Sequence, residues 1–143
     1  MSELKPRVLI VDDEERFRMT LSKLLKVKGL DVKALGSARE ALEELTDASY
    51  DVILLDVKMP EMDGVQALAE IKKRDPQLEV IMLTGHASVD VAVEIMRLGG
   101  YEYLLKPCPI EDLMDKIDAA FERKKAREER RKRVDGQAAE GGR

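Results

Sequence analysis

Five short apolar runs, each followed by a segment of helical character, constrain the fold of this chain more than any other feature. The runs occupy residues 8–11, 32–35, 52–55, 80–83 and 101–105. Three of them are continuously apolar and rich in β-branched residues, as expected for strands covered on both faces. The second run is more polar and indicates an edge strand. This alternation predicts an α/β fold: a five-stranded parallel sheet of order 2-1-3-4-5 with helices on both faces.

Capping residues mark where the predicted helices begin and end. Ser37, followed three residues later by Glu40, has the spacing of a capping box. The remaining start and stop signals are Gly29, Asp63, Pro76, Ser88, Gly99, Gly100 and Pro109. They place every helix between two of the apolar runs or after the last one.

Composition narrows the class of protein. The chain has 143 residues, enough for one domain with a genuine core, and its net charge of −4 argues against general nucleic-acid binding. Cys108 is the single cysteine, so an internal disulfide is excluded. Residues 1–7 lack the apolar core of a signal peptide, and no apolar run is long enough to span a bilayer. We therefore expect a cytoplasmic protein that does not insert into membranes.

Polar side chains follow four of the five predicted strands, at the point where each strand ends. Asp12 and Asp13 follow the first run, Asp56 the third, Thr84 the fourth and Lys106 the fifth. The predicted edge strand contributes none. Each of these residues alone is more often a turn or surface residue. Together they predict one pocket, because ligands bind beyond the carboxyl ends of parallel strands.

The residue types in this pocket suit phosphoryl chemistry. Three converging carboxylates ionise together only with a cation among them, and oxygen ligands without His or Cys favour Mg²⁺, with Mn²⁺ as the alternative. Lys106 supplies a positive charge and Thr84 a hydrogen-bond donor for a phosphoryl group. A carboxylate can then act as the nucleophile and form an acyl phosphate.

The motifs around these residues match a known family. Over residues 5–121 the chain resembles the receiver domain of two-component response regulators. The matching segments are VLIVDDE at 8–14, DVKMPEMDG at 56–64, LTGH at 83–86 and YLLKP at 103–107. The resemblance implies a flavodoxin-like fold with a receiver domain at residues 1–121. It also implies a signalling domain, not an enzyme, that promotes its own phosphorylation and dephosphorylation.

The resemblance also assigns roles to the metal and acceptor residues. Asp56 would take the phosphoryl group from a sensor histidine kinase, a histidine phosphotransfer protein or a small phosphodonor. Asp13, Asp56 and the backbone carbonyl of Lys58 would ligate Mg²⁺, and Asp12 would act through a metal-bound water.

A second set of implied roles concerns signal output. Thr84 would bond a phosphoryl oxygen, and Lys106 would pair first with Asp56 and then with the phosphoryl group. The Lys106-Pro107 peptide would be cis. Tyr103 would be the aromatic switch, with plain core packing as the alternative. The surface of the fourth helix, fifth strand and fifth helix would signal to a downstream protein, to an output domain missing from this chain, or to a second copy in a phosphorylation-dependent dimer.

Residues 122–143 form a basic extension of the last helix. Opposite charges four residues apart, such as Lys124 and Glu128, predict helix to about Arg133. From Gly136 the composition predicts a disordered tail. A solvated helix, a docking segment for an acidic partner and a linker to an output domain remain open; direct binding to nucleic acid is not expected.

Three other functions need to be weighed against this pattern. A haloacid-dehalogenase-type phosphatase also uses a nucleophilic Asp, Mg²⁺, Lys and Thr, but it requires Asp-x-Asp after the first strand. Here Asp12 and Asp13 are adjacent, and the isolated Asp56 follows the third run. An FMN carrier needs a Ser/Thr/Gly-rich loop after the first strand, where this chain is acidic. A metal-independent binding module would not need Asp13, Asp56 and Lys106 together.

Overall fold

The apolar runs form strands and the segments between them form helices, as the sequence predicts. The computed structural model describes residues 5–86 and 88–141, with side chains as far as Val134. The elements in chain order are β1 (Arg7–Val11), α1 (Glu15–Val27), β2 (Asp31–Leu35), α2 (Ala38–Asp47), β3 (Val52–Leu55), α3 (Gly64–Arg74), β4 (Glu79–Thr84), α4 (Val89–Arg97), β5 (Glu102–Leu105) and α5 (Ile110–Gly141).

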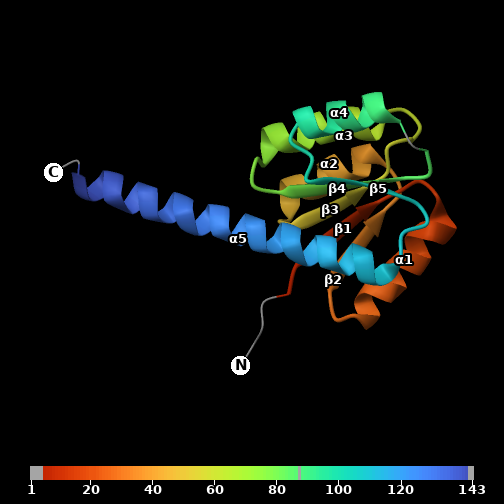
Figure 1. The fold of residues 1–143 in the computed structure, drawn as a ribbon, viewed down its shortest axis with the longest axis horizontal. Coiled ribbons are helices and arrows are strands. Elements are labelled where there is room, and N and C mark those ends of the chain that lie inside the picture. Colours follow the sequence, from red (N-terminus) through yellow and green to blue (C-terminus); the bar gives the residue numbers. More distant parts are fainter. Residues whose placement is uncertain (1–4, 87, 142–143) are drawn as a thin grey trace.

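The five strands form one parallel sheet in the order β2-β1-β3-β4-β5 (Figure 1). Val8 of β1 lies opposite Val32 of β2 on one side and opposite Val52 of β3 on the other. The predicted strand order is confirmed. It leaves β2 at an edge and makes the carboxyl ends of β1, β3, β4 and β5 neighbours.

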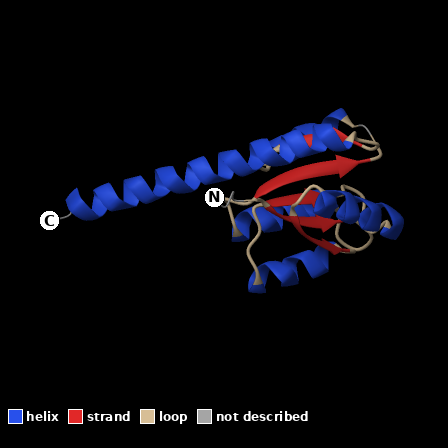
Figure 2. Ribbon diagram, turned by 90° about the horizontal axis from the view of Figure 1, so that it is seen from below, coloured by secondary structure: helices blue, strands red, loops and turns tan. Residues whose placement is uncertain are grey.

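Helices cover both faces of the sheet (Figure 2). Successive strand residues point to opposite faces. Leu9 and Val11 of β1 therefore pack in the core beneath α2, α3 and α4, whereas Val8 and Ile10 pack in the core beneath α1 and α5. All four side chains are fully or almost fully buried, so the near-continuous hydrophobicity of β1 follows from its two covered faces.

The predicted caps form with one difference. Ser37 Oγ accepts a hydrogen bond from the Glu40 N–H and donates one to the Glu40 carboxylate. Ser37 is thus the N-cap of α2, but the Glu40 side chain bonds the serine hydroxyl instead of its backbone N–H. Asp63 forms a complete capping box with Gln66 at the start of α3. Ser88 caps α4 by accepting from the Val91 N–H.

Helix α5 runs far past the body of the domain and projects away from it (Figure 1). Its helical backbone continues to Gly141, past Gly136, from which the sequence predicts a disordered tail; residues 142–143 of that tail lie outside the described residues. The residues after Gly136 include two alanines and a glutamate, which favour helix, and no proline to end it. In the part of the chain that the structure describes, no helix combines the length and apolarity needed to cross a membrane.

Candidate metal and phosphoryl site

Three carboxylates meet beyond the carboxyl ends of β1 and β3. Asp12 and Asp13 follow β1, and Asp56 follows β3, which lies beside it in the sheet. One carboxylate oxygen from each residue lies within 4.8 Å of the other two. Asp12 and Asp56 are only 2% and 8% exposed, whereas Asp13 faces solvent. The pocket is therefore acidic, buried at its base and open on one side.

The loop after β3 positions Asp56 through a close backbone approach. The Gly64 N–H donates a hydrogen bond to the Val57 carbonyl at 2.7 Å, which brings the start of α3 onto this loop. A β-carbon on Gly64 would lie 2.1 Å from the Asp56 carbonyl oxygen. Only glycine fits this approach, which explains the glycine that follows Asp63 in the sequence.

Lys106, which follows β5, reaches across the pocket. Its Nζ lies 2.6 Å from Asp12 Oδ2, 3.7 Å from Glu14 Oε1 and 3.9 Å from Asp56 Oδ1. The expected pairing with Asp56 is thus the longest of these three contacts. Asp12 is the most buried of the carboxylates, so it carries the largest cost of being left without a cation, and the lysine lies closest to it.

Burial and like charge raise the pKa of Asp56 to about 6. Loss of water around the carboxylate is the main cause, and the negative charge of Asp12 adds to it. The Lys106 ammonium and a hydrogen bond from the Lys58 backbone oppose the shift, and Asp13 reinforces it. Asp56 therefore holds a proton more readily than an ordinary aspartate, until a cation enters the pocket.

The donor set fits a hard divalent cation. The three side chains that could ligate an ion here, Asp12, Asp13 and Asp56, all offer carboxylate oxygens, the ligands that Mg²⁺ prefers. Asp12 has both oxygens engaged, Oδ1 by the Glu14 N–H and Oδ2 by Lys106. Asp13 and Asp56 are thereby the carboxylates with the most freedom to bind an ion directly.

The two expected switch residues contact the same short loop. Thr84, at the end of β4, is buried, and its Oγ1 accepts a hydrogen bond from the His86 N–H at 3.3 Å. The Tyr103 hydroxyl donates to the His86 carbonyl at 2.8 Å and accepts from the Ser88 N–H at 3.2 Å. The Lys106 N–H bonds the Thr84 carbonyl. The structure thus links the phosphoryl-binding candidates to β5 and α4 through this loop.

Three residues near the pocket were not predicted from the sequence as part of it. Lys106 Nζ lies 4.1 Å from the centre of the Phe17 ring, a cation–π contact, and Glu14 is its third acidic neighbour. Arg18 donates a hydrogen bond to the Asp12 carbonyl at 2.8 Å. Phe17 and Arg18 lie in the first turn of α1, directly after the acidic pair, and this proximity is the signal that could have identified them. The expected cis peptide is present between Lys106 and Pro107.

Comparison with known proteins agrees with this geometry. The model of the response regulator receiver domain matches residues 8–118. The chain is 39% identical over 107 residues to the regulatory protein AtoC of Escherichia coli strain K12, which covers 75% of this chain and 23% of AtoC. A crystal structure of a receiver domain protein from Clostridium thermocellum matches with a TM-score of 0.81 and 39% identity, over 85% of this chain and 98% of that chain. The beryllofluoride-activated NtrC4 receiver domain dimer matches with a TM-score of 0.78 and 42% identity, over 82% of this chain and 98% of that one.

Fold and pocket together define a doubly wound α/β signalling domain with an acidic site at the carboxyl edge of its sheet. The chain belongs to the response regulator receiver domain family. It spans about a quarter of the length of the curated relatives that it matches. Phosphorylation and Mg²⁺ binding at an acidic pocket are general features of this family, and membership decides against the phosphatase and FMN-carrier alternatives.

Proposed function

We propose that Asp56 is the residue of this receiver domain that accepts the phosphoryl group. The observation that carries the proposal is the convergence of Asp12, Asp13, Asp56 and Lys106 on one pocket. Asp56 lies at its base, between two further carboxylates and one cation. Asp13 is more exposed and Asp12 is held by Lys106, so Asp56 is the carboxylate best placed as nucleophile.

The transfer forms one bond and breaks one. A carboxylate oxygen of Asp56 bonds to phosphorus, and the bond from phosphorus to the donor breaks. For a phosphohistidine donor this is the P–N bond, and the imidazole leaves with the bonding electron pair and takes up a proton. Hydrolysis of the resulting acyl phosphate by water returns Asp56 and inorganic phosphate. We infer that this domain promotes both steps by positioning and charge, without further chemistry.

A bound Mg²⁺ would neutralise charge on the transferring phosphoryl group. Asp13 and Asp56 would hold the ion, together with the Lys58 carbonyl, and Asp12 would act through a water. Mn²⁺ offers the same oxygen preference. Lys106 carries the protein's own positive charge at the pocket, and it exchanges its carboxylate partner for the phosphoryl oxygens once Asp56 is modified.

The response to phosphorylation runs through the His86 backbone. A phosphoryl group attracts the Thr84 hydroxyl, which then releases its hydrogen bond from the His86 N–H. The His86 carbonyl is the acceptor of the Tyr103 hydroxyl, so the ring loses its support on the same loop and becomes free to turn inward. This changes the surface of α4, β5 and α5, to which Tyr103 belongs.

Likeness to the family supports a proposal for the partners. A sensor histidine kinase or a histidine phosphotransfer protein would donate the phosphoryl group in the cytoplasm. The recipient of the signal would be a downstream protein or an output domain beyond α5, because the curated relatives are several times longer than this chain. The NtrC4 receiver domain is a dimer in its beryllofluoride-activated form. We propose a phosphorylation-dependent dimer for this chain on that likeness.

Phosphorylation with a small donor tests the proposal directly. The protein is incubated with acetyl phosphate and Mg²⁺, and intact-mass spectrometry counts the phosphoryl groups. One base-labile group is expected on the wild type and on Asp47→Asn, which changes an exposed aspartate at the end of α2. Asp56→Asn should carry none at the site found by peptide mapping. Undiminished labelling of Asp56→Asn at the wild-type site would show that another residue is the acceptor.

A further inference from the structure

A buried carboxylate lies at the amino ends of the strands, opposite the phosphoryl pocket at their carboxyl ends. Glu79 is the first residue of β4 and Thr84 is the last, so this strand runs from the buried carboxylate to the phosphoryl pocket. Glu79 is 1% exposed, and its N–H donates a hydrogen bond to the Asp51 carbonyl at 3.2 Å. Two acidic residues, Asp51 and Glu79, therefore sit side by side where β3 and β4 begin. The chemistry of Asp56 uses neither.

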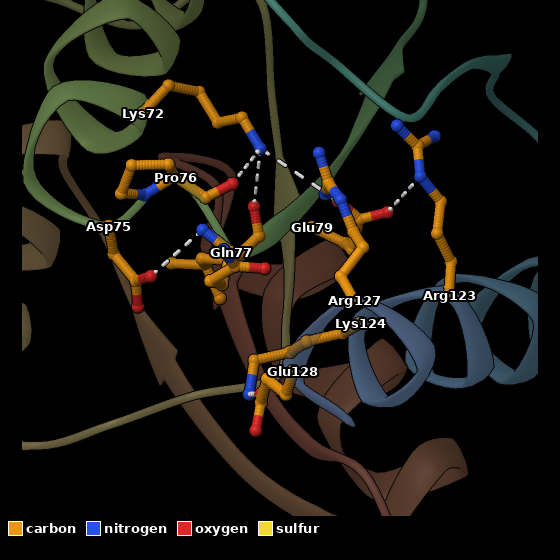
Figure 3. A network of polar contacts seen from close by, with 10 residues as sticks. Lys72, Asp75, Pro76, Gln77, Glu79, Arg123, Lys124, Arg127 and Glu128 are labelled. Carbon is orange, nitrogen blue, oxygen red and sulfur yellow. Dashed lines mark hydrogen bonds and ion pairs between the residues drawn. The ribbon is translucent and has the colours of Figure 1, made fainter. Parts of the chain in front are cut away.

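Three cations from two helices surround Glu79 (Figure 3). Arg127 donates a hydrogen bond to Oε1 at 2.7 Å, and Arg123 Nε lies 3.2 Å from Oε2. Both arginines come from α5, one turn apart. Lys72 of α3 lies 3.9 Å from Oε1 and donates hydrogen bonds to the carbonyls of Pro76 and Leu78. We call Lys72, Glu79, Arg123 and Arg127 the Glu79 cluster.

Lys124, the residue after Arg123 in α5, makes a second contact with this end of the sheet. Lys124 Nζ lies 3.1 Å from Asp51 Oδ1 and also bonds the Glu128 carboxylate. Asp51 in turn accepts a hydrogen bond from the Arg7 N–H at 2.7 Å, which holds its carboxylate in place. Burial lowers the pKa of Lys124, but its bonds to Glu128 and Asp51 outweigh this and raise it overall. The lysine therefore stays charged.

These contacts fall where α5 stops packing on apolar residues. Phe121 is the last residue of α5 in the hydrophobic core, and the helix then projects from the body (Figure 1). From Glu122 to Val134, the part of the projecting helix whose side chains are described, no apolar stripe holds it to the sheet. Each exposed charge pair within a helix changes the equilibrium constant between helix and coil by less than about threefold. A carboxylate taken out of water attracts its partners much more strongly, because solvent does not screen it.

We propose that the Glu79 cluster fixes the projecting part of α5 to the receiver body, so that residues 123–134 leave the domain as a rigid helix in one direction. This anchor does not depend on Asp56 being the acceptor. The buried carboxylate supplies the anchor, Arg123 and Arg127 hold one turn of the helix on it, and Lys124 adds Asp51. A segment attached beyond α5 would then be held at a defined orientation to the body.

Hydrogen exchange on the complete 143-residue chain tests the anchor. Amide protection of residues 124–134 is measured by NMR in the wild type and in Glu79→Gln. We expect protection there to fall by about tenfold or more, because local opening no longer has to break the cluster. Glu129→Gln is the matched control: it removes the same charge from an exposed position on this helix, and protection should change by less than about threefold.

A distance measurement tests the direction of the helix. Spin labels are placed at Thr46→Cys on α2 and at Arg131→Cys on α5, in a Cys108→Ser background. The distance distribution should be narrow in this protein and clearly broader when Glu79→Gln is added. Amides near Asp56 report whether the body remains folded.

The possible results distinguish a helix held by the Glu79 cluster from a helix that is rigid by itself. If Glu79→Gln does not fold, the double variant Arg123→Gln/Arg127→Gln decides, because it releases α5 while Lys72 still neutralises Glu79. Unchanged protection and an unchanged distance distribution in a folded variant would overturn the proposal. Equal losses of amide protection in Glu79→Gln and Glu129→Gln would also overturn the proposal, since the rigidity would then come from the charge on the helix alone.

Discussion

Replacing the acceptor candidate with its neutral isostere, Asp56→Asn, should stabilise the metal-free protein at neutral pH. The folded state raises the pKa of Asp56 from 3.8 to about 6. A raised pKa means that the fold favours the protonated form. The protonated Asp56 carboxyl therefore makes its full contribution to stability below the unfolded-state pKa of 3.8. This contribution is lost as the pH rises through about 6, where the carboxyl of the folded protein ionises.

The size of the effect follows from the shift. Each tenfold change in proton affinity corresponds to about 1.4 kcal/mol, so raising the pKa of Asp56 from 3.8 to about 6 corresponds to at most about 3 kcal/mol of lost stability above neutral pH. The carboxylate keeps some contact with solvent, so about 1–3 kcal/mol is the expected gain for Asp56→Asn at pH 7.5. As the pH falls below 3.8 the gain should approach zero, because the wild-type carboxyl is then protonated in the unfolded as well as the folded state.

Urea unfolding in the presence of EDTA measures this difference. The free energy of unfolding of Asp56→Asn minus that of the wild type is taken at several pH values, so that titrations shared by both proteins cancel. Asp47→Asn, the same change at an exposed position, is measured in parallel as the control. Saturating Mg²⁺ should reduce or reverse the advantage of Asp56→Asn, because the ion binds and stabilises the folded wild type. A difference that is independent of pH, or a variant less stable than the wild type in EDTA, would refute the assigned electrostatics.

Three further predictions concern the pocket and its supports. Lys106→Met should lower the free energy of unfolding in EDTA by about 2–4 kcal/mol, since it leaves Asp12 without its cation, and added Mg²⁺ should recover much of the loss in a urea titration. Gly64→Ala should destabilise the protein by about 2 kcal/mol or more in the same assay, because its β-carbon meets the Asp56 carbonyl; near-neutral stability would show that the loop yields. Thr84→Ala should still be phosphorylated by acetyl phosphate but should weaken the amide shifts of α4 and β5 in NMR spectra, and intact distant shifts would contradict the route through His86.

Much of this protein can be predicted from local sequence. Apolar runs of a few residues separated by helical segments determine the strands and the parallel sheet, because a strand covered on both faces must be apolar throughout. Asp63 and Ser88 could be identified as N-caps because the bonds they form are only three residues long. The pocket was predictable for a related reason: parallel strands end at one edge, so residues that follow them must meet there.

The tertiary structure decided which charges pair. Lys106 bonds Asp12, a residue 94 positions away, more closely than Asp56, and this depends on side-chain reach and burial in the finished pocket. The same holds for Arg127, which finds Glu79 at a separation of 48 residues, where helical spacing on α5 predicts only local pairs. Local spacing identifies neighbours along one element. Partners on different elements are fixed only when packing sets the distance between them and removes the water that would otherwise solvate each charge.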